Sequence, residues 1–300
     1  MKYPSYLNLS RTELKQRAIQ VRSILKSCTI CPRNCKINRL KEEKGFCRLG
    51  SKAIVSSWHP HFGEEACLVG VGGSGTIFFA HCNLACVYCQ NFDISQIGIG
   101  SEMSKEELAC AMLDLQNQGC HNINFVTPTP VVPQILEALP YALKNGLKIP
   151  LVYNTNAYDS VKTLKLLDGI VDIYMPDAKY ADTEIAKKYS LVPDYPKIMK
   201  RAIKEMHRQV GDLEIDKGGV ARRGLLVRHL VLPEKLSGTE KIMRFICNEI
   251  SENTYVNIMA QYRPEYKADK FPPLTRSVTN KEFQKAIEIA KRVGLKRIYM

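Results

Sequence analysis

From Gly75 onward, short apolar runs alternate with stretches of helical periodicity, and this alternation constrains the fold more than any other feature of the 300-residue chain. Helices are expected near residues 104–118, around 133, from about 159, over 239–250 and after Thr279. Six runs have the length and apolar character of buried strands: 77–79, 123–126, 151–153, 171–175, 225–232 and 256–260. Six such β/α units predict an α/β fold with a parallel sheet covered by helices.

The remaining segments have weaker patterns. Residues 1–25 predict a basic amphipathic helix from about Arg11, and residues 51–74 are expected to be a linker that ends in a Gly-rich stretch. Within 182–223, helical patterns precede a Gly-Gly turn at Gly218 that indicates a hairpin. We therefore expect an N-terminal helix and cysteine module over 1–68 and a core domain over 69–300.

Polar residues follow the ends of the predicted strands. In barrels of parallel strands, chemistry occurs at the carboxyl ends of the strands, so these residues are candidates for a site at one mouth of an open barrel. They are Cys82, Thr127, Asn154, Asp177, His229 and Gln261.

Three cysteines follow the first strand with the spacing C-x3-C-x2-C: Cys82, Cys86 and Cys89. A four-iron cluster has four corners to ligate, so three thiolates leave one position open, as in a reactive metal site. The alternative is a zinc site in which His81 supplies the fourth ligand. Asn83 and Asn91 are placed to donate hydrogen bonds around such a centre.

A second group, Cys28, Cys31, Cys35 and Cys47, supplies a complete set of four thiolates. Residues 26–50 have little hydrophobic periodicity, so a bound metal is expected to stabilise them in place of an apolar core. Zinc and an iron–sulfur cluster both fit four thiolates, and a partly vacant or redox-active thiol site is a third reading. Eleven cysteines, an odd number with metal-type spacing, favour metal sites over disulfides.

The cysteine loop closely resembles the signature of radical S-adenosylmethionine (radical SAM) enzymes, including the aromatic Tyr88 before the last cysteine. Further strings are Cys-Pro-Arg-Asn-Cys, His-Phe-Gly-Glu-Glu, Gly-Ser-Gly-Thr-Ile-Phe-Phe and Asp-Ile-Tyr-Met-Pro-Asp. Together they resemble, over roughly residues 26–275, the uncharacterised radical SAM homologues of pyruvate formate-lyase activating enzyme. The resemblance implies a partial (β/α)6 TIM-like barrel of the radical SAM type with a small N-terminal cysteine-rich metal-binding module.

The resemblance also implies cofactor-binding residues. Where the family has a Gly-Gly-Glu-type stretch for the amino group of S-adenosylmethionine, this chain has Thr-Pro-Thr-Pro, which leaves backbone carbonyls or the two threonine hydroxyls as acceptors. An Asn-Thr-Asn stretch and an Asp-x-Lys segment resemble those of glycyl-radical activators, and one arginine corresponds to a residue that reaches the cofactor carboxylate. The candidates are Thr127, Thr129, Asn154, Asn156, Asp177, Lys179 and Arg228.

Some of these residues also have a purely structural reading. The Pro-rich turn can simply end a strand, and Asp177 with Lys179 can be an ion pair at a strand end. His229 lies on the opposite strand face from Arg228 and is read as structural, whereas Tyr262 is a substrate-side candidate. Glu64 and Glu65 precede the first strand and either position the N-terminal module or face solvent.

The implied activity is reductive cleavage of S-adenosylmethionine at a [4Fe-4S] cluster to a 5′-deoxyadenosyl radical, which abstracts hydrogen from a substrate. The first hypothesis is activation of a glycyl-radical enzyme. The alternatives are modification of a small anionic metabolite or an RNA, and a non-catalytic iron–sulfur protein. A reducing electron donor of the flavodoxin or ferredoxin type is the expected partner.

Composition adds limited information. Hydrophobic residues form 45% of the chain and charged residues 24%, which are values of a globular domain. The net charge of +13 agrees with a solvated basic surface, an anionic substrate, an acidic partner or an RNA. There is no long apolar run and no signal-peptide pattern, so no membrane contact and a cytoplasmic location are expected.

Overall fold

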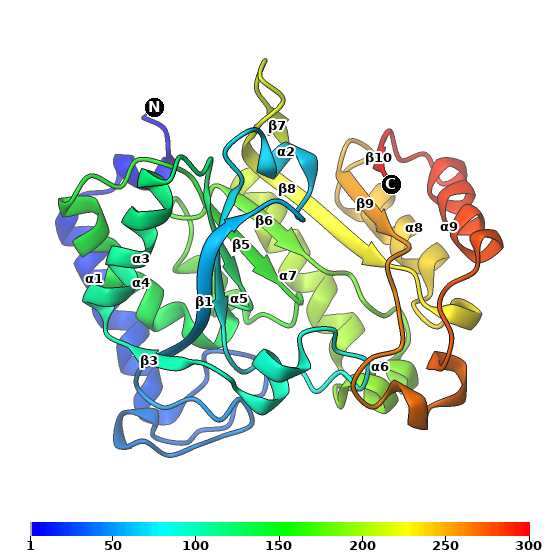
Figure 1. The fold of residues 1–300 in the computed structure, drawn as a ribbon, viewed down its shortest axis with the longest axis horizontal. Helices are drawn as coiled ribbons and strands as arrows, with labels where there is room; N and C mark the ends of the chain where they lie inside the picture. Colours follow the sequence, from blue (N-terminus) through cyan, green and yellow to red (C-terminus); the bar gives the residue numbers. More distant parts are fainter. Residues whose placement is uncertain (1) are drawn as a thin grey trace.

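The computed structural model describes residues 2–300 and contains one ten-stranded sheet with the order β10-β9-β8-β6-β5-β4-β2-β1-β3, with β7 paired to β8 (Figure 1). Neighbours from β2 to β10 along this order are parallel, whereas β1 is antiparallel to both β2 and β3. The strands are β1 (Ala53–His61), β2 (Ser74–Phe79), β3 (Ser101–Met103), β4 (Ile123–Val126), β5 (Leu151–Thr155), β6 (Ile173–Pro176), β7 (Glu214–Ile215), β8 (Ala221–Leu230), β9 (Tyr255–Met259) and β10 (Arg297–Tyr299). The predicted parallel α/β sheet of six units is confirmed, and it ends at two separate edges, β3 and β10.

Helices cover the outer face of this curved sheet (Figure 1). Two of them, at the positions predicted, begin with capping boxes, Ser104 with Glu107 and Thr279 with Glu282, in which each side chain bonds the other residue's backbone. The helices are α1 (Arg11–Ser23), α2 (Ala66–Val69), α3 (Lys105–Asn117), α4 (Val132–Lys144), α5 (Val161–Lys165), α6 (Thr183–Ser190), α7 (Tyr195–Val210), α8 (Thr239–Glu249) and α9 (Asn280–Arg292).

Alternate strand residues face opposite sides of the sheet, and the two sides differ in chemistry. The outward residues join the main apolar core beneath the helices; Phe79 and Phe125 stack there with ring centroids 6.1 Å apart. Inside the barrel, a smaller apolar cluster of Val152, Ile173 and Leu226 packs against Leu68 of α2. The short helix α2 therefore closes the amino end of the barrel, and the chemistry is left to the carboxyl end.

The segment 51–74, expected to be a linker, instead contains the strand β1. Ala53, Ile54 and Val55 pair with β3, and the rest of β1 pairs with β2 through a register shift. The strand is not recognised in the sequence because it contains Pro60, and proline has no backbone N–H to donate to a neighbouring strand. In the described residues, Pro60 lies where β1 pairs with β2 and no longer with β3. The expected division at residue 68 stays a prediction, and one strand of the sheet lies on its N-terminal side.

The N-terminal region folds as a helix followed by irregular backbone. The predicted helix from Arg11 is confirmed as α1, which packs against α4. Between α1 and β1 the chain forms only short 3-10 turns, at Ile24–Ser27 and Arg39–Lys41. The last strand, β10, was not expected because three residues carry too little periodicity to be recognised.

Candidate functional site

The loop after β2 carries Cys82, Cys86 and Cys89 at the carboxyl end of the parallel strands. All eleven cysteines of the chain are free thiols. Burial raises the pKa of Cys82 to about 12 and that of Cys86 to about 11. Binding of a metal centre to these sulfurs therefore has to displace their protons.

Each of the three sulfurs is close to a hydrogen-bonding partner. The Sγ of Cys82 accepts from the backbone N–H of Leu84 and from Nδ2 of Asn156, both at 3.3 Å. The Sγ of Cys86 accepts from the Ser190 hydroxyl at 3.0 Å, and the Sγ of Cys89 lies 3.0 Å from the Ser95 hydroxyl. Hydrogen bonds to thiolates tune the potential of a bound cluster, so the loop is already surrounded by groups that can do so.

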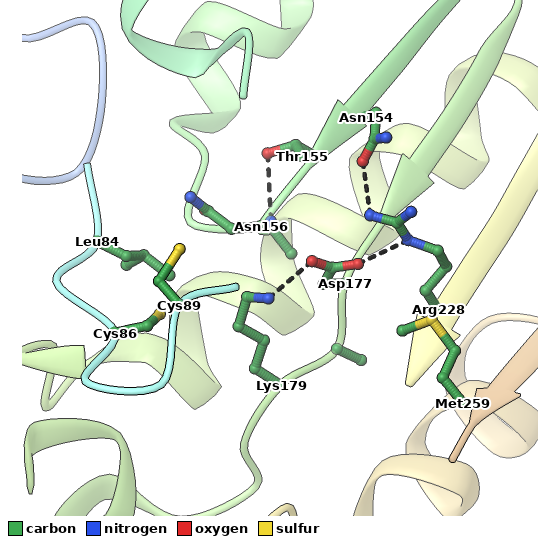
Figure 2. Close-up of polar contacts among 12 residues, drawn as sticks. Leu84, Cys86, Cys89, Asn154, Thr155, Asn156, Asp177, Lys179, Arg228 and Met259 are labelled. Atoms are coloured by element: carbon green, nitrogen blue, oxygen red, sulfur yellow. Dashed lines mark hydrogen bonds and ion pairs between the residues drawn. The ribbon is translucent and has the colours of Figure 1, made fainter. Parts of the chain in front are cut away.

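A chain of charged side chains lies beside this loop in the barrel (Figure 2). The Arg228 guanidinium donates to Asp177 at 2.8 Å and to Asn154 at 2.7 Å, and the Lys179 ammonium donates to Asp177 at 2.7 Å. Burial alone raises the pKa of Asp177, but the two cations outweigh burial, so the net shift is downward. The network therefore holds Asp177 ionised, with Lys179 between it and the cysteine loop (Figure 2).

Two carboxylates enter the barrel from the segment between β1 and α2. Glu64 lies 3.4 Å from Arg228, and only 8% of its side chain is exposed. Burial raises the pKa of Glu64 to about 7, against the opposing effect of Arg228. Glu65 accepts a hydrogen bond from Asn257 at 2.8 Å. Within residues 2–300, its other carboxylate oxygen and the side-chain Nδ2 and Oδ1 of Asn124 are buried without a hydrogen-bond partner. The expectation that these two glutamates face solvent or position the N-terminal module is wrong.

The structure brings four of the candidate cofactor residues together and separates the other three. Asn154, Asp177, Lys179 and Arg228 form the network described above. Asn156 lies beside the cysteine loop, where Nδ2 donates to Cys82 and to the Oδ1 of Asn83, the latter at 2.8 Å.

The two threonines of the Pro-rich turn differ in their surroundings. Thr129 is fully buried, and its hydroxyl donates to Asp159 at 2.7 Å beneath the barrel mouth. Thr127 is half-buried and has a φ of 61°, a left-handed conformation that β-branched residues rarely adopt. Of the two hydroxyls, that of Thr127 is therefore the better placed for a ligand.

Two further candidates have structural contacts. His229 is buried on the outer face, between the Ala178 carbonyl at 2.7 Å and the Thr239 hydroxyl at 3.0 Å, and burial lowers its pKa to about 4. Its structural reading is confirmed. Tyr262 is also buried, with its hydroxyl donating to the Leu274 carbonyl at 2.7 Å, so the expectation of a substrate-side role is wrong.

The sequence is similar to a family model and to a known protein. The radical SAM superfamily model matches residues 76–216. Uncharacterized protein MJ0674 of Methanocaldococcus jannaschii is 38% identical over 288 residues, which cover 93% of this chain and 78% of the relative. The chain belongs to the radical SAM superfamily.

Solved structures that align with this chain are more distant in sequence. Native anSMEcpe with bound AdoMet aligns with a TM-score of 0.48 and 13% identity, over 71% of this chain and 57% of that structure. The FeFe-hydrogenase maturase HydG from Carboxydothermus hydrogenoformans aligns with a TM-score of 0.47 and 15% identity, over 72% and 49%. This radical SAM chain therefore spans about half the length of the solved structures it matches.

The donor set after β2 fits a radical SAM cluster. It offers three free thiols on one loop, surrounded by hydrogen-bonding partners. Within residues 2–300, no three His, Cys, Asp or Glu side chains lie close enough to hold a single metal ion, and this holds for both groups of cysteines. Thiolates are soft ligands that suit iron and sulfide.

The four N-terminal cysteines line one small pocket with a cavity volume of about 10 Å³. Burial raises the pKa of Cys31 to about 12 and also raises that of Cys47. A Cβ at Gly45 would lie 3.0 Å from the Cys35 sulfur, so glycine is the residue that leaves this sulfur its space. The four thiols therefore line one common pocket, although within residues 2–300 no three of them lie close enough to hold a single metal ion.

The glutamates and asparagines in the barrel interior are hard to recognise in the sequence. Asn124 and Asn257 lie inside apolar strands, where a single polar residue is easily taken for noise. The available signal was the alternation along β4 and β9, which places both on the inward face.

In the part of the chain that the structure describes, no helix is long and apolar enough to cross a membrane.

Proposed function

We propose that this chain uses a [4Fe-4S] cluster on Cys82, Cys86 and Cys89 to cleave S-adenosylmethionine reductively. The observation that carries the proposal is the three-thiolate loop at the carboxyl end of the strands in a chain of the radical SAM superfamily. When bound, the cluster supplies one electron, and the cofactor supplies a 5′-deoxyadenosyl radical that abstracts a hydrogen atom from the substrate. The protein's part is to position the reacting groups and exclude water.

The remaining residues are proposed to bind the cofactor or the substrate. Thr127 follows β4, Asn156 lies beside the cysteine loop, and both side chains suit polar groups of the cofactor. Arg228 suits a carboxylate because of its planar fork, although Asp177 and Asn154 now occupy it. Thr129 can take part only if its hydrogen bond to Asp159 opens.

We propose a glycyl-radical polypeptide as the substrate. The Asp177–Lys179 pair resembles the Asp-x-Lys segment of glycyl-radical activators, and its position beside the cysteine loop suits contact with a peptide backbone. The barrel interior contains three carboxylates and two cations in this network. It therefore lacks the basic character expected of a pocket for an anionic metabolite or RNA, which remain the alternative substrates.

We propose that the four N-terminal cysteines hold an auxiliary iron–sulfur cluster in preference to zinc. Four cysteines that line one pocket match the four thiolate ligands of a four-iron cluster. The proposed electron donor is a flavodoxin or ferredoxin. The proposed location is the cytoplasm, where free thiols stay reduced.

The cleavage proposal is tested by reconstituting the clusters anaerobically, reducing the protein with dithionite and measuring 5′-deoxyadenosine. The wild-type protein and Cys110→Ala, which changes an exposed cysteine on α3, should both form it. Cys86→Ala should form none. A wild-type protein that has its iron but forms no 5′-deoxyadenosine would contradict the proposal.

Two further measurements address the finer proposals. Addition of a glycyl-radical polypeptide should give its organic radical signal in electron paramagnetic resonance (EPR) spectra, whereas turnover of an RNA or an anionic metabolite in its place favours the alternatives. Iron counting on the variant that lacks Cys82, Cys86 and Cys89 should find iron at the N-terminal site. Zinc at that site would refute the auxiliary cluster.

A further inference from the structure

Arg33 connects the two cysteine sites directly. It lies within the N-terminal module, between Cys31 and Cys35, and its side chain extends to the loop after β2. Its Nε donates to the carbonyl of Asn83 at 2.9 Å, and Asn83 immediately follows Cys82. Nη1 also donates to the carbonyl of Leu191 at 2.7 Å. Two hydrogen bonds of the guanidinium therefore join segments that are far apart in sequence.

The guanidinium is enclosed between aromatic rings of both parts. It lies 3.6 Å from the ring centroid of Phe46, the neighbour of Cys47, and 5.6 Å from that of Tyr158, which follows β5. Tyr158 is in turn fixed to the cysteine loop, since its carbonyl accepts from Asn83 Nδ2 at 2.8 Å. This enclosure restricts Arg33 to one position. Lysine lacks the planar, forked head group that stacks on aromatic rings in this way.

The charge of Arg33 acts on both thiol sets. Arg33 lies between Cys31 and Cys35 in the chain, and its Nε bonds the carbonyl of the residue that follows Cys82. Its Nη2 is buried without a hydrogen-bond partner, so part of its donor capacity is free for whatever occupies the adjoining space. A buried cation near a cluster favours the state that carries one more electron, because net charge is among the factors that set the potential.

We propose that Arg33 is a positioning residue that couples the two cysteine sites: it fixes the Cys82 loop against the N-terminal module and, by its charge, stabilises the reduced form of the cluster on Cys82, Cys86 and Cys89. The proposal rests on the proposed function, since it concerns the cluster assigned there. Reduction adds one electron from an external one-electron donor to that cluster, and no bond forms or breaks. Arg33 makes this addition easier without touching the substrate.

The test is an EPR-monitored redox titration of the reconstituted full-length protein with titanium(III) citrate, without S-adenosylmethionine. Arg33→Gln should move the midpoint potential of the three-cysteine cluster to more negative values. Arg33→Lys, which keeps the charge, should stay close to the wild type. The matched control is Arg17→Gln, because Arg17 on α1 also donates to distant backbone carbonyls, those of Leu166 and Asp168, and lies outside both cysteine segments.

An Arg33→Gln variant with wild-type iron content and an unchanged potential would overturn the proposal. If that variant does not retain its iron, Arg33→Lys decides, because a lysine variant with a clearly more negative potential would show that charge is not the coupling. Failure of the proposed function is a separate result. It is seen as absence of 5′-deoxyadenosine in the wild type, whatever the titration shows.

Discussion

The two cysteine sites have the same ligands but are supported in opposite ways. The Cys82 loop extends from a buried strand and lies beside a network of buried charges, so the fold itself positions it. The N-terminal module has only short 3-10 turns around its four cysteines, and its thiols converge on a pocket. We infer that the barrel site is preformed, whereas the module depends on its metal for structure.

The largest expected effect is at the preformed site. Cys86→Ala should reduce S-adenosylmethionine cleavage by more than the ~100-fold typical of losing a residue behind the ligands, because it removes a ligand itself. The thermal midpoint should stay close to that of the wild type, since strands and not the cluster hold this loop. Cleavage assays and calorimetry check the two halves. A large fall in the midpoint would show that the barrel site also depends on its cluster.

Loss of the metal from the N-terminal module should unfold that module locally. Cys31→Ala is expected to make residues 26–50 sensitive to a protease, because free energy of metal binding there takes the place of an apolar core. The readout is limited proteolysis followed by mass spectrometry, with Cys110→Ala as the control. Equal protection in Cys31→Ala and the control would contradict a metal-dependent module.

The charged network should matter for stability independently of any metal. Arg228→Leu leaves the ionised Asp177 with Lys179 alone and removes the guanidinium beside Glu64, so the free energy of unfolding should fall by about 3 kcal/mol. Urea denaturation of the metal-free protein measures this. Arg244→Leu breaks an exposed pair with Glu240 and should cost less than about 1 kcal/mol. Similar costs for both variants would show that the barrel network does not support the fold.

The smallest expected effect is a dependence on pH. The folded chain holds the proton of Glu64 up to about pH 7, whereas an unfolded chain releases it near the ordinary value of 4.5. The stabilisation from Glu64 is therefore fully present below pH 4.5 and is lost as the pH rises to about 7.

Glu64→Gln cannot lose this proton. Its free energy of unfolding, relative to the wild type, should therefore rise by about 1–3 kcal/mol between pH 5 and pH 8. Urea denaturation at both pH values checks this, with the exposed Glu240→Gln as a control. A difference that does not change with pH would show that Glu64 is ionised throughout.

The contrast between the sites also explains what could be predicted from sequence. The six strands and the capping boxes follow from local periodicity and short-range spacing, and the cysteine loop follows from a fixed spacing. By contrast, Glu64 reaches Arg228 across 164 positions of sequence, and the contact of Arg33 with Asn83 spans 50. Such contacts depend on how the barrel closes, which no local pattern encodes. The strand β1 was not predicted because it contains Pro60, and proline is more typical of a linker than of a strand.

We propose that the cluster on Cys82, Cys86 and Cys89 has an open position and that the N-terminal centre has none. The most direct test is the EPR spectrum of the reduced protein with and without S-adenosylmethionine. The cofactor should change the signal of the three-cysteine cluster and leave that of the N-terminal centre unchanged. A spectrum in which the cofactor alters neither signal, or alters only that of the N-terminal centre, would contradict the account.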